Sequence, residues 1–224
     1  WDGGAGTTSW FDANNWSGNA VPTSADEVRL NAGTVAVNNN FASIGVLNVG
    51  YFPGPGTLIV ENGGSVVTRG HVLTGNSTPG TGTITVTGMG STIASGGHVF
   101  IGNSGAATGT LTVSDGGSVS SATGYNIYVG NTSSNTGAIT VTGTGSTLES
   151  GRSVFIGYSG TGTLTVSDSG TVSAAWVLTI AKYAGSTGTL NIGAASGYAA
   201  AAPGTVSASS GIVFGSGTGS IVFN

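Results

Sequence analysis

Short segments in which apolar residues alternate with small or polar residues recur along the chain at a nearly constant interval. One segment has the pattern glycine-x-aliphatic-x-aliphatic, and its successive starts differ by 26, 27, 28, 25 and 26 residues. These segments start at Gly56, Gly82, Gly109, Gly137, Gly162 and Gly188. Alternation of this kind predicts a β-strand with one buried face, so each period is expected to contain one such strand.

Each period contains two further apolar segments, which predict two more strands. One of them ends at a glycine, which alanine replaces in the last period: Gly50, Gly75, Gly102, Gly130, Gly157 and Ala181. The other is marked by one apolar position between its neighbours: Val66, Ile93, Val119, Leu148 and Val172. Three short strands with glycine-rich turns, all in one phase, predict an all-β fold, a parallel β-solenoid with three strands per coil of about 25–28 residues.

Other all-β architectures fit the period less well. Hairpin folds give no reason for a phase that is shared by every period. Blades of a β-propeller use about 40–50 residues, which is longer than one period. Segments of the same sequence type also recur after 53, 53 and 55 residues. This double period leaves a propeller as a possible alternative.

Alternation also assigns side chains to the two faces of each strand. In the glycine-x-aliphatic segments, two aliphatic columns are expected to point inward, and one of them is Leu58, Ile84, Leu111, Ile139, Leu164 and Leu190. The column between them points outward and is mostly threonine. T-x-T pairs such as Thr83/Thr85 are typical of some ice-binding faces, but threonine is also simply favoured in exposed strands. Ala138, Ile59 and Asn191 interrupt the threonine array.

An outward row of large apolar side chains is the best candidate for a binding site. It is expected in the strands that end at the column of glycines and consists of Leu73, Phe100, Tyr128 and Phe155. Contiguous exposed apolar surface often marks a partner site, and aromatic residues are enriched at such sites. The alternative is cross-strand stacking that only stabilises the sheet.

The two ends of the chain differ in composition from the repeats. Residues 1–22 contain Trp1, Trp10 and Trp16, so we expect an N-terminal cap there, followed by β-helix repeats over residues 23–224. The segment Ala194–Pro203 interrupts the period, and no second cap is evident near Asn224. The sequence therefore predicts that the repeats continue in a longer protein.

Composition narrows the function. Only 5% of the residues are charged, the net charge is −4, and there are 43 glycines and no cysteine. So few basic residues argue against a nucleic-acid partner, and the glycine content argues against helices.

Few residues are candidates for chemistry. The histidines His71 and His98 are expected side by side, but the sequence shows no third residue that could complete a metal site with them. Asp115 and Asp168 occupy equivalent turns, where aspartate commonly bonds backbone. We therefore expect no catalytic residues, no metal site and no cofactor.

The run GTLTVSDGGSV…IYVG…GAITVTGTGSTL…VFIGYSGTGTLTVSDSGTV resembles the repeat of bacterial autotransporter (type V secretion) passenger domains and of some exosortase-sorted surface proteins. The opening W…SWFDANNWSGNAVPTSADEV and the later GTLNIGAASGYAAAAPGTV are similar to the first and later coils of such passengers. This resemblance covers essentially the whole chain. It implies a right-handed parallel β-helix that is exported to the bacterial cell surface or secreted, and a full-length protein with a C-terminal outer-membrane β-barrel.

The expected function is therefore that of a non-enzymatic passenger acting as an adhesin, a self-association factor or an extended stalk. Its partner would be a host-cell surface, an extracellular-matrix protein or another copy of the chain. Three alternatives remain open: a virulence ligand for a host receptor, a carbohydrate-active β-helix enzyme and an ice-binding protein.

Overall fold

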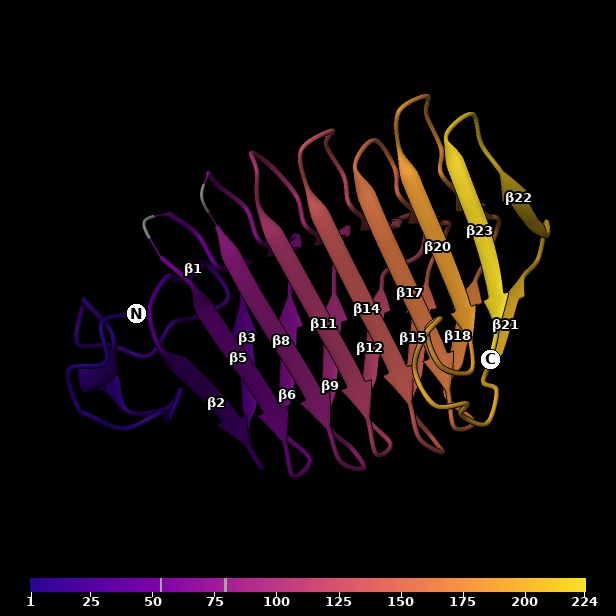
Figure 1. The fold of residues 1–224 in the computed structure, drawn as a ribbon. Helices are drawn as coiled ribbons and strands as arrows, with labels where there is room; N and C mark the ends of the chain where they lie inside the picture. The colour runs from indigo at the N-terminus through magenta and orange to yellow at the C-terminus, as the bar shows by residue number, and fades with distance from the viewer. Residues whose placement is uncertain (53, 79) are drawn as a thin grey trace.

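The computed structural model describes residues 1–52, 54–78 and 80–224, and over these residues the chain forms a three-sided parallel β-solenoid (Figure 1). Each complete coil contributes one strand to each of three sheets in a fixed order, and the last coil contributes only β22 and β23. Every strand pairs in parallel with the equivalent strand of the next coil, as β11 does with β8 and β14. The predicted all-β solenoid with three strands per coil is confirmed.

Sheet 1 is formed by the strands that lead to the glycine column: β1 (Glu27–Leu30), β4 (Val46–Val49), β7 (Val72–Thr74), β10 (Val99–Ile101), β13 (Ile127–Val129), β16 (Val154–Ile156), β19 (Leu178–Ile180) and β22 (Ile212–Phe214). Sheet 2 contains the longer strands: β2 (Thr34–Asn38), β5 (Gly56–Glu61), β8 (Thr81–Thr87), β11 (Thr108–Ser114), β14 (Thr136–Thr142), β17 (Thr161–Ser167), β20 (Thr187–Ile192) and β23 (Thr218–Phe223). Sheet 3 contains the strands around the single apolar position: β3 (Phe41–Ile44), β6 (Ser65–Thr68), β9 (Thr92–Ser95), β12 (Ser118–Ser121), β15 (Thr147–Ser150), β18 (Thr171–Ala174) and β21 (Thr205–Ala208).

The core is a set of aliphatic columns that run along the solenoid axis. In sheet 2, Leu111 pairs in register with Ile84 and Ile139, and all three are buried. Sheets 1 and 3 supply further buried columns, for example through Ile101 and Val119. Each buried aliphatic side chain stabilises the fold by about 1.5–3 kcal/mol, which explains how a chain so rich in glycine folds.

The first coil is covered by residues 1–22, which include a short 3-10 helix at Ala13–Asn15. Trp10 and Trp16 are buried, with their rings edge to face at 4.9 Å, and the Trp16 indole N–H donates to the Trp10 carbonyl at 2.8 Å. A parallel bridge joins Ser9 to Ala36 in β2. The indole rings therefore close one end of the apolar core.

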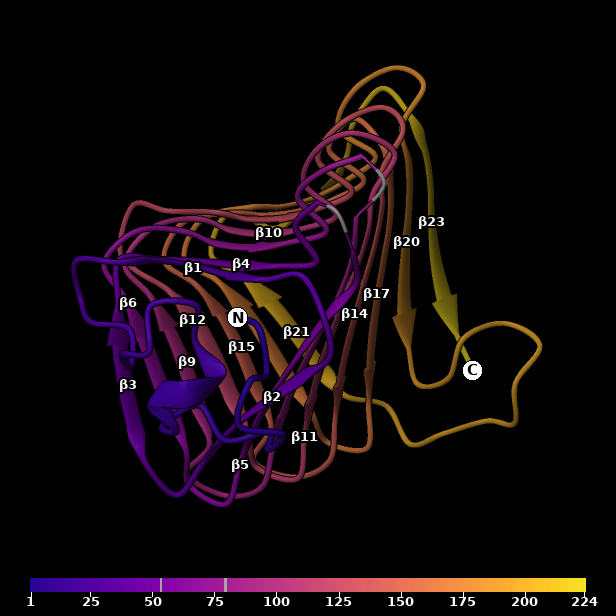
Figure 2. The same cartoon turned by 90° about the vertical axis from the view of Figure 1, so that its left-hand side faces the viewer.

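In six consecutive coils, the chain turns from sheet 1 toward sheet 2 through one residue in the left-handed backbone region. Glycine occupies this position in five coils, and at Gly157 φ is +74°. Ala181 takes the same place with φ +53°, although its side chain carries a Cβ. The loops that follow this position stack on one another as a lobe beside the solenoid (Figure 2).

The last coil differs from the others in exposure. Its side chains that continue the core columns, such as Phe214 in β22 and Phe223 in β23, are exposed. Before this coil, the chain leaves the solenoid after β20 as a wide loop (Figure 2) and returns through an antiparallel bridge between Pro203 and Ser167. The interruption that the sequence predicts over 194–203 is this loop.

Candidate functional site

The predicted row of outward apolar side chains lies together on the outer face of sheet 1. Strand register places Leu73, Phe100, Tyr128 and Phe155 side by side in consecutive coils. The Phe100 and Tyr128 rings stack with centroids 4.9 Å apart and planes 8° apart, and Tyr128 and Phe155 stack at 5.2 Å and 14°. All four side chains are half-buried. The structure thus brings the predicted residues together, and their role in binding stays a prediction.

Stacking determines which part of these rings a partner can reach. Because the ring faces of Phe100, Tyr128 and Phe155 contact one another, ring edges form most of what the row presents outward. Tyr158, in the loop after β16, packs edge-on against Tyr128 and Phe155 at 5.0 and 5.1 Å. We call Phe100, Tyr128, Phe155, Tyr158 and Tyr183 the aromatic strip.

Two tyrosines extend the strip from sheet 1 onto the neighbouring loops. The Tyr158 and Tyr183 hydroxyls lie 3.3 Å apart, and the Tyr183 ring is edge-on to that of Tyr158 at 5.0 Å. The hydrogen bond to Tyr183, together with burial, raises the pKa of the Tyr158 hydroxyl to about 12. About half of the Tyr183 side chain is exposed. These two residues were missed in the sequence because they lie in loops, outside the alternation that marks strands.

The histidine pair caps the turns that connect sheet 3 to sheet 1. The His71 and His98 rings stack at 5.4 Å, and the backbone N–H of His98 donates to His71 Nδ1 at 2.9 Å. His98 Nδ1 accepts in the same way from the backbone N–H of Asn126, whose Oδ1 accepts from Ser153 N–H at 3.1 Å. Burial and the neighbouring His71 lower the pKa of His98. Both Nδ1 atoms therefore accept backbone N–H groups of the next coil, which gives the pair a structural role.

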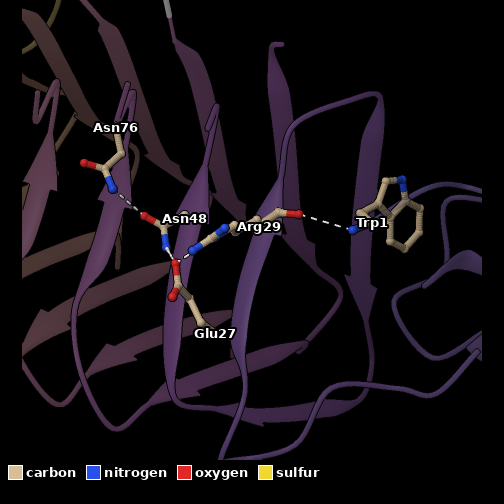
Figure 3. Close-up of polar contacts among 5 residues, drawn as sticks. All are labelled: Trp1, Glu27, Arg29, Asn48 and Asn76. Carbon is tan, nitrogen blue, oxygen red and sulfur yellow. Dashed lines mark hydrogen bonds and ion pairs between the residues drawn. The ribbon is translucent and has the colours of Figure 1, made fainter. Parts of the chain in front are cut away.

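A chain of polar side chains runs along the solenoid beside the strip and begins at a carboxylate (Figure 3). Glu27 Oε1 accepts from Arg29 Nε and from Asn48 Nδ2, each at 2.9 Å. The Asn48 Oδ1 then accepts from Asn76 Nδ2 at 2.6 Å. The same contact recurs from Asn103 to Asn76 at 2.6 Å and from Asn131 to Asn103 at 3.0 Å. We call Asn48, Asn76, Asn103 and Asn131 the asparagine ladder.

This ladder stabilises the solenoid by joining consecutive coils. All of its amide groups donate toward the Glu27 carboxylate, so each bond polarises the next in the same direction. Sequence reasoning missed it, although a signal existed: Asn76, Asn103 and Asn131 each follow the turn glycine. The backbone nitrogen of Trp1 donates to the Arg29 carbonyl at 3.2 Å (Figure 3). A cleft of about 520 Å³, whose lining includes Trp1 and Arg29, lies between the cap and the first coil.

The acidic residues of the repeat turns do not converge on a catalytic centre. Asp115 and Asp168 have φ of +53° and +50°, and each carboxylate accepts from a threonine hydroxyl of the preceding coil, at 3.1 Å from Thr87 and 3.0 Å from Thr142. They act in turns as predicted, but they bond to a neighbouring coil and not to their own backbone. Across residues 1–52, 54–78 and 80–224, no three His, Cys, Asp or Glu side chains gather as metal ligands.

The outward threonine columns lie in register on sheet 2. Thr83 pairs with Thr110, and Thr85 with Thr112, as the alternation predicts. At the break, Asn191 is buried and its Nδ2 donates to Thr165 Oγ1 at 3.0 Å, so this position is part of the inter-coil bonding. Nothing charged lies on β8, β11, β14 or β17.

Comparison with known proteins yields no relative. No family model, no curated protein and no solved structure matches the chain. Within the described residues there is also no helix that is long and apolar enough to cross a membrane. The functional conclusion therefore depends on the fold and on the surfaces described above.

Proposed function

We propose that this chain is a non-enzymatic autotransporter passenger, carried on the bacterial cell surface or secreted, that works as an adhesin with the aromatic strip as its contact surface. The observation that carries the proposal is the strip itself, a continuous row of aromatic side chains across four coils of sheet 1 and its loops. Aromatic side chains supply large contact area and are enriched at protein interfaces. The partner is a host-cell surface or extracellular-matrix protein, or a second copy of the chain.

The regular solenoid suits this role because it holds the strip on a rigid and extended support. Consecutive coils are about 4.8 Å apart, and the register of sheet 1 does not shift between β7 and β19. Tyr183, at the outer end of the strip, is about half exposed and is the strip residue that a partner can reach most easily.

The proposal is tested by binding of the purified chain to host cells, to immobilised matrix proteins and to itself. Two variants separate recognition from folding: Tyr158→Ser/Tyr183→Ser removes the loop aromatics, and Phe100→Ser/Tyr128→Ser/Phe155→Ser removes the stacked row. Thr110→Ala/Thr112→Ala on sheet 2 is the matched control, because it truncates outward side chains on another face.

Loss of binding in a strip variant whose circular dichroism is unchanged, with the control still binding, supports the adhesin. Binding that survives in both strip variants would refute the role of the strip. A wild-type chain that binds neither cells, matrix proteins nor itself would instead favour a stalk that presents another part of a longer protein.

A further inference from the structure

A groove on the outer face of sheet 3 departs from the regular repeat and is separate from the aromatic strip. It has a volume of about 550 Å³ and crosses β12, β15, β18 and β21. Its floor contains Ser120, Glu149, Ser173 and Ser207, which lie in register in consecutive coils. Four adjacent strands span about 14 Å along the solenoid axis, so the groove has room for a short stretch of an extended ligand.

The groove has one wall because a single turn is longer than its counterparts. The chain takes five residues, 122–126, to pass from β12 to β13, whereas three residues, 151–153, connect β15 to β16 and three, 175–177, connect β18 to β19. The longer turn is fastened to the next coil by the Gly124 N–H, which donates to the Gly151 carbonyl at 3.0 Å. Thr123 in this turn lines the groove, and Tyr125 is exposed beside it.

The side chains of the groove fit a polyhydroxylated ligand. Glu149 is exposed, and within the described part of the chain its carboxylate has neither a hydrogen bond nor an ion pair. Its neighbours in register, Ser120 and Ser173, offer hydroxyls that can both donate and accept. A carboxylate with free lone pairs accepts two adjacent hydroxyl groups well.

An exposed aromatic residue follows the groove lining directly in the sequence. Trp176 directly follows Ala175, which lines the groove, and half of its side chain is exposed. The Arg152 guanidinium lies 5.3 Å from the Trp176 ring centroid and holds one side of the indole. Indole and phenol rings combine a large apolar surface with a polar tip, which matches the C–H faces and hydroxyl edges of sugar rings.

We propose that this groove binds a neutral oligosaccharide, with Glu149 and the serine hydroxyls bonding the sugar hydroxyls and Trp176 packing against a sugar face. The central carboxylate disfavours an anionic chain, and the scarcity of large apolar side chains on the floor disfavours an apolar peptide. The groove binds and does not cleave, because among its lining residues Glu149 has no second carboxylate to act with. This inference does not depend on the aromatic strip.

The test uses the full chain and a panel of neutral hexasaccharides: cellohexaose, maltohexaose, mannohexaose and hexa-N-acetylchitohexaose. Binding is measured by titration calorimetry and by tryptophan fluorescence, for which Trp176 is the one tryptophan outside the cap. We expect at least one of them to bind, and Glu149→Gln and Trp176→Ala each to weaken it by about tenfold or more. Ser173→Tyr, which fills the groove at an outward position, should abolish binding with the fold intact.

Matched controls are Glu61→Gln, a carboxylate on sheet 2, and Tyr198→Ala, an exposed aromatic on the 193–204 loop. Both should bind like the wild type. The proposal is overturned if none of the four sugars binds at millimolar concentration, if binding survives Ser173→Tyr, or if an acidic hexasaccharide such as hexagalacturonate binds more tightly. Cell or matrix binding lost only in the strip variants leaves this result unaffected, so the two proposals fail separately.

Discussion

The residues with a left-handed backbone at the turn from sheet 1 to sheet 2 give a quantitative test of the fold. At Gly157, φ is +74°, and an added Cβ would overlap the Thr187 carbonyl oxygen and lie 2.7 Å from its carbon. The left-handed conformation costs a residue with a Cβ about 1–2 kcal/mol, and a forced shift in a packed region costs a further 1–3 kcal/mol. Gly157→Ala should therefore destabilise the protein by about 2–5 kcal/mol.

Two controls separate these contributions. Gly63 also has a left-handed backbone, with φ +78°, but nothing lies within 4 Å of an added Cβ. Gly63→Ala should therefore cost only the conformational part, about 1–2 kcal/mol. Ala181→Gly relieves about the same backbone strain. It also destabilises the fold by about 0.5–1 kcal/mol, because glycine gives the unfolded chain more conformational entropy, and by about 0.8 kcal/mol through loss of a buried methyl group. Ala181→Gly should change stability by less than about 1 kcal/mol.

The assay is urea unfolding followed by far-ultraviolet circular dichroism, with thermal unfolding as a second measurement. For a chain of this size, 1 kcal/mol shifts the melting temperature by about 2–4 °C, so Gly157→Ala should lower it by at least about 4 °C. The reasoning is refuted if Gly157→Ala unfolds at the same urea concentration and temperature as the wild type, or if Gly63→Ala loses as much stability as Gly157→Ala.

Three further outcomes follow from the side-chain contacts. Asn103→Ala removes two ladder hydrogen bonds and should cost about 1–3 kcal/mol in urea unfolding. Asn131→Ala removes one ladder bond of 3.0 Å and a weak contact of 3.5 Å to the Asn103 carbonyl, so it should cost about half as much; equal losses would contradict the ladder. Because the pKa of His98 is lowered in the folded state, the stability that its neutral ring contributes should be complete above about pH 6.5 and lost as the pH falls through the folded pKa. His98→Asn should remove this pH dependence and still accept the backbone N–H of the next coil, as the Asn126 side chain does one coil later. An unchanged dependence of stability on acid pH in this variant would argue against a role of His98. Spectrophotometric titration should find a pKa of about 12 for Tyr158, which Tyr183→Phe brings toward the ordinary value of about 10. The stability linked to the Tyr158 hydroxyl is present below about pH 10 and lost as the pH rises toward 12. A titration that Tyr183→Phe leaves unchanged would exclude the hydroxyl pair as the cause of the raised pKa.

Much of the fold could be predicted from the sequence because its repeat is strict. Alternation at Leu111 and its equivalents determines which face of each strand is buried. Because the strands recur at the same place in every period, parallel stacking of the coils brings equivalent residues into register. The predicted row of Leu73, Phe100, Tyr128 and Phe155 follows from the same alternation. Their stacking geometry does not, because ring orientation depends on neighbours such as Tyr158 that lie in irregular loops.

The inter-coil polar contacts were less predictable. The sequence shows that His71 and His98 share a position, but only the structure shows that each Nδ1 accepts a backbone N–H from the next coil. The groove was missed for another reason. Glu149 occupies an ordinary outward strand position, and its surroundings become a groove only because the turn after β12 is two residues longer than its counterparts.

That longer turn shows where this architecture tolerates change. On either side of it, β12 keeps its register with β9 and β15, and β13 keeps its register with β10 and β16. Extra residues at a corner are therefore accommodated outside the stacked strands, and they alter the local surface without moving the core. A gene encoding such a repeat can acquire a new recognition loop in one coil while all the other coils stay as they are, and the corners of the solenoid are the positions at which peptides could be grafted for display.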